Sequence, residues 1–266
     1  MIIHPSIVSK KVFLSTPSHI YLYPHPMLKP YISHYTLSIS SVGETAETLT
    51  LIPDIAGCIV FTPDQHHVHM KFWGATTKTV VVDNIDPPLR FFIEFRPGGS
   101  FCLTGIPQST LLNEQIPLSS LLPKWQQLFE EAWFQTIDID DFLELLEAFL
   151  ISQIQFQESH AFLQDALSQI TLGKDIQDIC SFSSRHINRI FHQTIGTSIK
   201  QYERLARINK AMSDIQDLQL SLTEVAYQSG YYDQAHFIHE FKQICGVTPG
   251  AYRKQMSAFY NEAFKF

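Results

Sequence analysis

The sequence predicts an α+β protein with a β-rich N-terminal barrel or sandwich, a helical connector, and an all-α C-terminal domain of two helix–turn–helix units. Three observations predict this fold class. The 266 residues are enough for about two domains, and 45% of them are apolar. Apolar residues recur with a period of two up to about residue 106, and with helical spacing after residue 118. The helical half also contains an internal repeat.

The N-terminal hundred residues are predicted to form short strands. One strand is expected near Val12 to Leu14, and three prolines exclude a helix between Tyr21 and Tyr31. Further strands are predicted where apolar runs are separated by proline, glycine and aspartate turns, at residues 35–39, 49–52, 57–61, 79–82 and 89–95. Such spacing is typical of an antiparallel barrel or sandwich, which we describe as cupin-like.

From Leu118 onward the pattern becomes helical. One apolar stripe, with acidic residues including Glu147 mostly on the other face, is formed by Phe142, Leu145, Leu146, Phe149 and Leu150. We expect this stripe to pack on the β-rich domain, with a homodimer contact as the alternative. The polar segment 153–158 is the expected interdomain connection. The predicted division is 1–117 for the β-rich domain, 118–158 for a helical connector and 159–266 for the C-terminal domain.

The clearest helical pair runs from Leu220 to Tyr252. Ser221 and Glu224 have the spacing of a capping box, and Gly230 is the expected stop of that first helix. Asp233 is the expected N-cap of the second helix, whose predicted buried stripe is Phe237, Phe241 and Ile244. This arrangement is how a helix–turn–helix presents a recognition helix to DNA. An αα-hairpin that only packs is the alternative.

Residues 175–202 repeat this pattern. Gln177 and Ser181 precede Ala226 and Gly230 by 49 positions. At an offset of 50, Ile187 matches Phe237, Phe191 matches Phe241, Gly196 matches Gly246 and Tyr202 matches Tyr252. The one-residue difference falls in the turn, where insertions are tolerated. Two units, about 175–196 and 222–246, joined by a helix from Ser198 to about Ile215, would form a compact all-α domain.

The segment EVAYQSGYYDQAHFIHEFKQICGVTPGAYR, Glu224 to Arg253, resembles the signature of AraC-family bacterial transcription regulators. The first unit departs from that family pattern, because Gln177 and Ser181 replace the usual Ala and Gly. Phe95 to Pro107, FRPGGSFCLTGIP, resembles the sensor domain of one branch of the family. The resemblance implies promoter DNA as partner and activation through RNA polymerase, with repression left open. The effector that the sensor would bind is unknown.

Base-reading residues are expected on both recognition helices, the first from about Ser184 to Thr194. Arg can grip guanine O6 and N7, and Asn or Gln can do the same for adenine N6 and N7. Ile238 could meet a thymine methyl group, and Ala235 occupies a further base-facing position. We expect the first unit to specify sequence and the second mainly to position the protein. The predicted base readers are Arg185, Asn188, Arg189, Gln234, Ile238 and His239.

Other polar side chains of the domain are predicted to contact phosphates or position the protein. A solvated helix face is the alternative for the basic residues. His186 and His236 occupy equivalent places, which favours a structural or phosphate-contact role over catalysis. Ser183 and Asp233 are interpreted as helix caps. The predicted positioning residues are Ser184, His186, His192, Arg204, Arg207, Lys210, His236 and Lys242.

The net charge of −7 is unevenly distributed. Residues 1–159 carry 8 basic and 16 acidic side chains, a net charge of −8, whereas residues 160–266 carry 11 and 10, a net charge of +1. DNA affinity should therefore depend on local basic clusters and be modest and strongly salt-sensitive. Four scattered cysteines are interpreted as buried thiols in a reducing cytoplasm. No apolar run is long enough for a transmembrane helix, and no signal peptide is expected.

Catalysis and metal binding are the weaker interpretations of this sequence. His66, His67 and His69 invite comparison with a metal-binding cupin, but Asp64 to His67 has the character of a polar hairpin tip. Gly98 and Gly99 indicate a tight turn. No catalytic residues, cofactor or metal ligands are predicted. The alternatives left open are a metal-dependent cupin enzyme, or a protein-binding sensor, fused to a DNA-binding domain.

Overall fold

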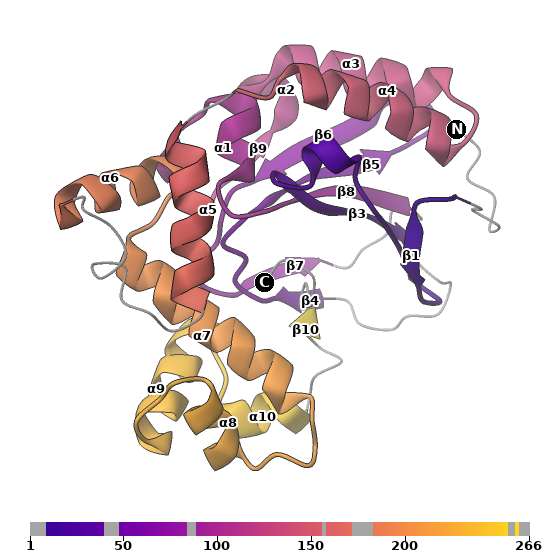
Figure 1. Cartoon of the computed structure of the whole chain (residues 1–266). Coiled ribbons are helices and arrows are strands. Elements are labelled where there is room, and N and C mark those ends of the chain that lie inside the picture. The colour runs from indigo at the N-terminus through magenta and orange to yellow at the C-terminus, as the bar shows by residue number, and fades with distance from the viewer. Residues whose placement is uncertain are drawn as a thin grey trace.

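The computed structural model describes residues 9–39, 48–83, 89–155, 158–171, 183–254 and 259–260. Its N-terminal part is a large antiparallel sheet with helices α3 and α4 across one face, and its C-terminal part is a group of helices (Figure 1). The β-rich N-terminal and helical C-terminal parts predicted from the sequence are confirmed.

Two sheets make up the N-terminal part. The seven-stranded sheet has the order β1–β2–β3–β8–β5–β6–β9, and its neighbouring strands are all antiparallel. These strands are β1 (Val12–Ser15), β2 (His19–Leu22), β3 (Ile32–Ile39), β5 (Cys58–Pro63), β6 (Val68–Trp73), β8 (Leu89–Phe95) and β9 (Gln115–Pro117). The three-stranded sheet consists of β10 (Phe259–Tyr260), β4 (Thr48–Leu51) and β7 (Val80–Asp83), in that order.

The centre of the large sheet is the β3–β8 pair. Tyr35 lies opposite Ile93 and Leu37 opposite Phe91, and all four side chains are buried. The predicted strands are present, but β2, β6, β9 and β10 were missed. In β6 the buried and exposed residues do alternate, yet its one histidine, His69, was considered only as a possible metal ligand. A period of two is hard to see over so short a run.

Short and medium helices complete the described N-terminal part. They are η1 (Pro26–Leu28), α1 (Gly99–Thr104), α2 (Leu118–Leu121), α3 (Pro123–Gln135) and α4 (Ile139–Ser152), with the 3-10 turn η2 (Gln108–Thr110) between α1 and α2. The buried side chains of α3 and α4 join the same apolar core as the large sheet, so the predicted connector packs on the β-rich domain.

Two details of the α4 prediction were wrong. Leu145 is 46% exposed, because it lies at the edge of the stripe whose centre is Phe142, Leu146 and Leu150. Glu147 is buried: it accepts a hydrogen bond from the backbone N–H of His25 at 2.7 Å and pairs with Lys11. The side of α4 that carries Glu147 is therefore covered by residues from the beginning of the chain.

The C-terminal helices share a second apolar core. They are α5 (Glu158–Thr171), α6 (Ser184–Thr194), α7 (Ile199–Ile215), α8 (Leu222–Gln228), α9 (Gln234–Cys245) and α10 (Pro249–Lys254). The long helix predicted after Ser198 is confirmed as α7, with Ser198 as its N-cap. The predicted supporting helix of the first unit, including Gln177 and Ser181, lies outside the described residues.

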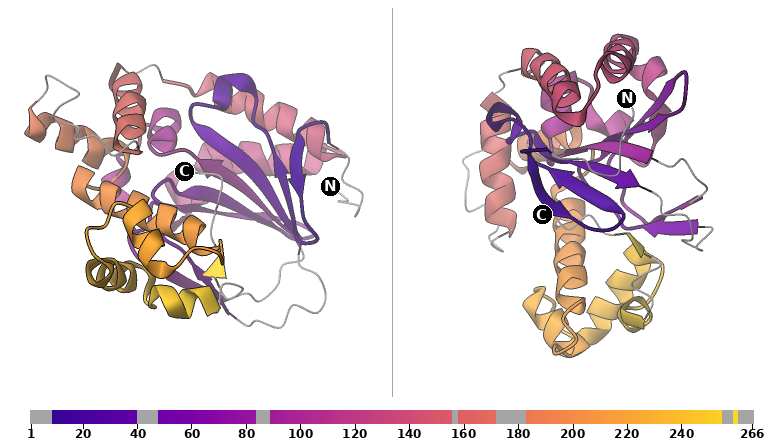
Figure 2. Two further views of the ribbon diagram at one scale, coloured as in Figure 1. Left: turned by 60° about the horizontal axis from the view of Figure 1, so that its bottom comes forward. Right: turned by 90° about the vertical axis from the view of Figure 1, so that its right-hand side faces the viewer.

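The two parts are in direct contact. Ile52 and Ile55 come from the N-terminal part, yet they pack in the core of the C-terminal helices. At the other end of the chain, β10 pairs in parallel with β4, so residues after α10 return to the smaller sheet (Figure 2).

Candidate nucleic-acid interface

Helix α6 is the predicted recognition helix of the first unit. The Ser183 side chain accepts a hydrogen bond from the backbone N–H of His186 at 3.3 Å, which confirms the cap. Ile187, Ile190 and Phe191 are buried, and Ile187 and Phe191 belong to the core of the C-terminal helices. Their spacing therefore turns the opposite arc of α6 to the outside.

The basic readers of the first unit lie on that outer arc. Arg185 and Arg189 are exposed, and a guanidinium nitrogen of Arg189 lies 3.3 Å from Nδ1 of His186. Asn188 is different, because it is half-buried and both ends of its amide are engaged. Its Nδ2 donates to the Ser184 carbonyl at 3.0 Å, and its Oδ1 accepts from the Ile199 N–H at 3.4 Å. Asn188 would have to leave these partners to read a base.

The helix pair α8–α9 forms the second unit as predicted. Ser221 and Glu224 make a complete capping box, and Gly230 has the expected positive φ, of 81°. Asp233 caps α9, because its side chain accepts from the His236 N–H at 2.7 Å. The apolar stripe of Phe237, Phe241 and Ile244 is buried.

The second unit offers fewer strong readers. Gln234 is half-buried, and its carbonyl oxygen accepts from the Thr223 hydroxyl at 3.2 Å. Ile238 is also half-buried and packs against the helical core. His239 is exposed, with its Nε2 2.9 Å from the Gln243 amide. Ala235 is exposed and has no hydrogen-bonding group.

A buried carboxylate joins α9 to α7. The Glu240 side chain is only 5% exposed, and its Oε1 lies 3.1 Å from Nε of Arg204 and 3.6 Å from Nη2 of Arg207. Its other oxygen lies 3.3 Å from Nε2 of His236. Arg207 also lies over the Tyr231 ring, 5.6 Å from its centroid. We call Glu240, Arg204, Arg207 and His236 the Glu240 cluster.

Sequence reasoning missed the role of Glu240 and assigned its three partners to phosphates. The structure shows all three engaged with a carboxylate inside the domain. A signal was present: Glu240 immediately precedes Phe241 and follows Phe237 by three, so it borders the buried stripe. A carboxylate at such a position needs a cationic partner when it is buried.

Burial also favours the neutral forms of one tyrosine and two cysteine side chains. The pKa of Tyr231 is raised by desolvation and by the neighbouring Glu240 charge, with Arg207 and Arg204 opposing the shift. Burial raises the pKa of the Cys245 thiol, and of the Cys102 thiol, to about 12. Cys102 and Cys245 are buried as predicted, Cys58 is only half-buried, and Cys180 lies outside the described residues.

The other predicted positioning residues are dispersed. Lys210 donates to the carbonyl of Gln228, at the end of α8. Ser184, His192 and Lys242 are exposed. The exposed surface of the two recognition helices therefore carries few cations, with Arg185 and Arg189 in the first half of α6 and at its middle as the main group.

The predicted polar hairpin tip at Asp64 is confirmed. Its Oδ1 accepts from the N–H groups of His66 and His67 at 2.7 Å each, and these bonds lower its pKa. His69 lies 3.2 Å from Asp64 and His67 lies 3.5 Å from Glu130. Within the described ranges, no group of three or more His, Cys, Asp or Glu side chains is placed to hold a metal ion.

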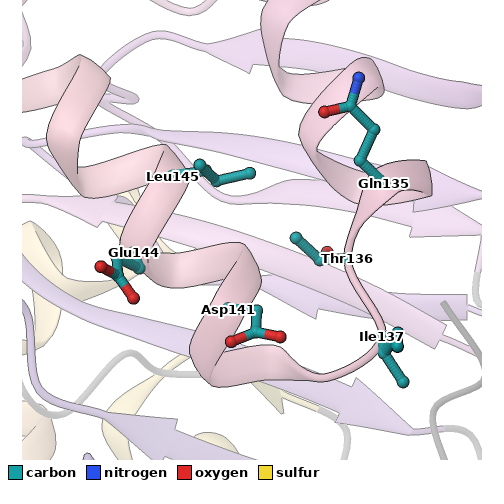
Figure 3. Close-up of a pocket in the computed structure, with 6 residues that line it drawn as sticks. All are labelled: Gln135, Thr136, Ile137, Asp141, Glu144 and Leu145. Carbon is teal, nitrogen blue, oxygen red and sulfur yellow. The ribbon is translucent and has the colours of Figure 1, made fainter.

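A shallow pocket of about 290 Å³ lies where α3 turns into α4 (Figure 3). Acidic and apolar side chains share its lining: Gln135, Thr136, Ile137, Asp141, Glu144 and Leu145. Ile137 is 83% exposed, so the apolar part of this surface faces outward. None of the predicted DNA-contacting residues lines it.

Two domain families match the sequence. Residues 177–255 match a helix-turn-helix domain and residues 21–117 match a domain of unknown function, DUF6597. The C-terminal part is thus a helix-turn-helix domain, the class of structure that α8, α9 and their caps define. It is a domain of the AraC type, as the resemblance of Glu224 to Arg253 indicated.

Curated relatives are bacterial regulators. The uncharacterized regulator YbfP of Bacillus subtilis is 29% identical over 39% of this chain and 35% of its own length. GlxA of Rhizobium meliloti is 34% identical, over 29% of this chain and 24% of its own. The activator RhaR of Cronobacter sakazakii is 33% identical, over 32% and 31%. The chain thus spans between a quarter and about a third of these relatives, all named transcriptional regulators or activators.

A solved structure of apo ToxT from Vibrio cholerae covers 83% of this chain and 97% of its own, at 12% identity and a TM-score of 0.42. Among the described residues, no helix is both long and apolar enough to cross a membrane.

Proposed function

We propose that this protein is a sequence-specific regulator of transcription that binds double-stranded promoter DNA in the cytoplasm. The observation that carries the proposal is an AraC-type helix-turn-helix domain whose α6 exposes Arg185 and Arg189 on the arc opposite its buried face. Helix-turn-helix proteins place this arc in the major groove. Two units on one face of DNA would read sites about 34 Å apart, one helical turn.

The two units would divide the work. Arg185 and Arg189 have the forked donors that recognise guanine, so α6 would supply most of the base discrimination. Gln234, Ile238 and His239 would add weaker contacts from α9. The Glu240 cluster would support α9 through Arg204, Arg207 and His236. The remaining candidates for phosphate contacts are Lys210, Lys242, His186, His192 and Ser184.

The N-terminal domain, residues 1–117 with the connector 118–158, would sense a signal. One face of its sheet is apolar and covered by α3 and α4, whereas the other carries buried polar residues. Thr36 is fully buried, and its hydroxyl has no hydrogen-bond partner within the described residues. His34 and Glu94 are buried on the same face, on paired strands. Buried polar groups normally have partners, and a bound effector would provide one.

The regulator would act as an activator that contacts RNA polymerase. The relative RhaR is named a transcriptional activator, which supports activation as the mode of regulation. It would act as a homodimer, and the outward-facing Ile137 and Leu145 on the α3–α4 surface support a contact there. Exposed apolar side chains that share one surface are typical of interaction sites.

Selection of bound sites from random duplex DNA by the full chain, at two salt concentrations, tests the proposal. We expect a motif with two parts about one helical turn apart, bound less tightly at the higher salt concentration. Weak binding without sequence enrichment, abolished by salt, would contradict the proposal. Enrichment of a single part would confine base readout to one unit.

A further inference from the structure

The turn that follows α6 is buried under the N-terminal domain. Thr194, Ile195 and Thr197 are no more than 4% exposed. A Cβ placed on Gly196 would lie 2.7 Å from the Gln108 carbonyl oxygen and 3.3 Å from the Ser109 nitrogen. Gly196 has a φ of 93°, so it also needs the left-handed conformation. The η2 turn of the N-terminal domain therefore rests directly on the end of the first recognition helix.

The loop before α1 extends this contact. A Cβ on Gly98 would meet the Leu163 side chain at 2.5 Å and the Thr194 carbonyl oxygen at 3.9 Å. The Gln164 amide donates to the Pro97 carbonyl at 3.3 Å. Residues 96–99, RPGG, therefore contact both α5 and the end of α6. The tight turn expected at Gly98 and Gly99 begins the short helix α1.

A second contact lies at the end of the other recognition helix. The Thr79 N–H, just before β7, donates to the Ile244 carbonyl near the C-terminus of α9 at 3.3 Å. Ile52 and Ile55, from the same N-terminal domain, lie in the core of the C-terminal helices. The N-terminal domain therefore touches the C-terminal ends of both α6 and α9.

These contacts leave three of the six predicted base readers, Arg185, Arg189 and His239, exposed, together with Ala235. Asn188, Gln234 and Ile238 are half-buried, and the partners given for them above lie within the C-terminal domain. Helix-turn-helix proteins contact base edges with the N-terminal residues of the recognition helix. The N-terminal domain holds the opposite ends, so it does not occupy the reading surface.

We infer that the N-terminal domain is part of the DNA-reading unit: its contacts at Gly196 and Ile244 fix the placement of the two recognition helices and so determine the site spacing that the protein accepts. This inference rests on the proposed DNA-binding function. Gln108 and Thr79 act as positioning residues, because they touch the ends of the helices and not the predicted readers.

Small movements at these contacts would matter. Helix α6 has 11 residues and is about 16 Å long. A tilt of about 15° about its C-terminal end would move the reading end by about 4 Å, which exceeds the base-pair rise of about 3.4 Å. The second unit is bound to α7 by the ion pairs of the Glu240 cluster, whereas α6 is held to α7 by the shared apolar core, the Phe191–Tyr202 ring contact and the Asn188–Ile199 hydrogen bond.

The test compares glycine variants of the full chain on the two-part motif that the parent protein selects. In Gly196→Ala the new Cβ would press on Gln108 of the N-terminal domain. Gly230→Ala is the matched control: its φ of 81° gives similar backbone strain, but the nearest atom to its Cβ is Cδ of Arg207 at 3.7 Å. Binding is measured on the motif and on versions with the two parts one or two base pairs closer or farther apart.

The parent protein and Gly230→Ala should disfavour the altered spacings by roughly tenfold or more, the size of a one-base-pair mismatch. Gly196→Ala should bind the altered spacings with affinities within about threefold of its affinity for the original motif. It should keep the base preference of each part of the motif. Circular dichroism checks folding; if Gly196→Ala does not fold, Gly98→Ala, which presses on Leu163, takes its place.

Retained spacing discrimination in the folded variant would overturn the inference while leaving DNA binding intact. Tighter binding at every spacing would also overturn it, and would identify the contact as an autoinhibitory one. A parent protein that selects no two-part motif would refute the proposed tandem function itself, and this inference with it.

Discussion

The turns that follow the two recognition helices differ at their glycines. Gly196 and Thr197 are buried, whereas the matching Gly246 is exposed and Val247 is half-buried. The residues just before these glycines are buried in both units. Gln108 and Ser109 of the N-terminal domain lie directly against Gly196. The same glycine turn is thus enclosed in the first unit and more exposed in the second.

The two units also differ at one equivalent position inside the domain. Ile190 of α6 matches Glu240 of α9 at the offset of 50. Ile190 is a buried apolar side chain, whereas Glu240 is a buried carboxylate that lies among Arg204, Arg207 and His236. The second unit is therefore held by ion pairs to α7, and the first by apolar packing and by another domain. A sequence repeat preserves the motif without preserving what supports it.

The largest expected effect is on the ion-paired support of the second unit. Glu240→Ala should lower the free energy of unfolding by about 3 kcal/mol, because removing one partner leaves Arg204 and Arg207 without their carboxylate. Chemical denaturation of the full chain measures this change. Glu131→Gln, on an exposed carboxylate, is the control and should have almost no effect. A loss below about 1 kcal/mol for Glu240→Ala would mean that the cluster contributes little to stability.

The next largest expected effect is a difference between the two units in the DNA affinity lost when a base reader is substituted. Arg189→Ala or Arg185→Ala should lower affinity for the selected motif by about 1–3 kcal/mol while leaving the fold intact. Gln234→Ala should lower it by less, because the Gln234 carbonyl is already bonded to Thr223. Fluorescence anisotropy at constant salt compares the three variants. An equal or larger loss for Gln234→Ala would reverse the assigned division of roles.

A substitution of Asn188 tests whether this residue of the first unit stabilises the fold or reads a base. Its amide bonds to Ser184 and Ile199, so Asn188→Ala should lower the free energy of unfolding by about 1 kcal/mol. Base preference should then change little. Ile238→Ala, at the matching position of α9, serves as the comparison: it should lower the free energy of unfolding through lost apolar packing. If the preference for adenine at one position were lost without a loss of stability, Asn188 would be a base reader instead.

The smallest expected effect is a pH dependence confined to the second unit. Hydrogen bonds with Ser221 lower the pKa of Glu224 below its ordinary value of 4.5. Because the pKa is lower in the folded state, the capping box contributes fully above about pH 4.5 and weakens as the pH falls through the folded value. Hydrogen exchange of the first α8 amides reports this. Glu224→Gln should remove the dependence, and an unchanged profile would assign it to another group.

Local sequence predicted the helices of the second unit closely. Ser221, Gly230 and Asp233 act through neighbours within four residues, so their roles follow from spacing alone. The periods of two and 3.6 likewise predicted most strands and helices. They failed for β6 and for Leu145, where a short run or an edge position made the pattern ambiguous.

The sequence by itself determined the class of the C-terminal domain, its caps and the chemical types of its readers, because these depend on contacts within a few turns of helix. Only the tertiary structure decided which polar residues are committed to the fold. Arg204 meets Glu240 across 36 positions, and Gly196 meets Gln108 across a domain boundary. Such contacts depend on how separate elements pack together, and no local pattern of spacing or propensity encodes that packing.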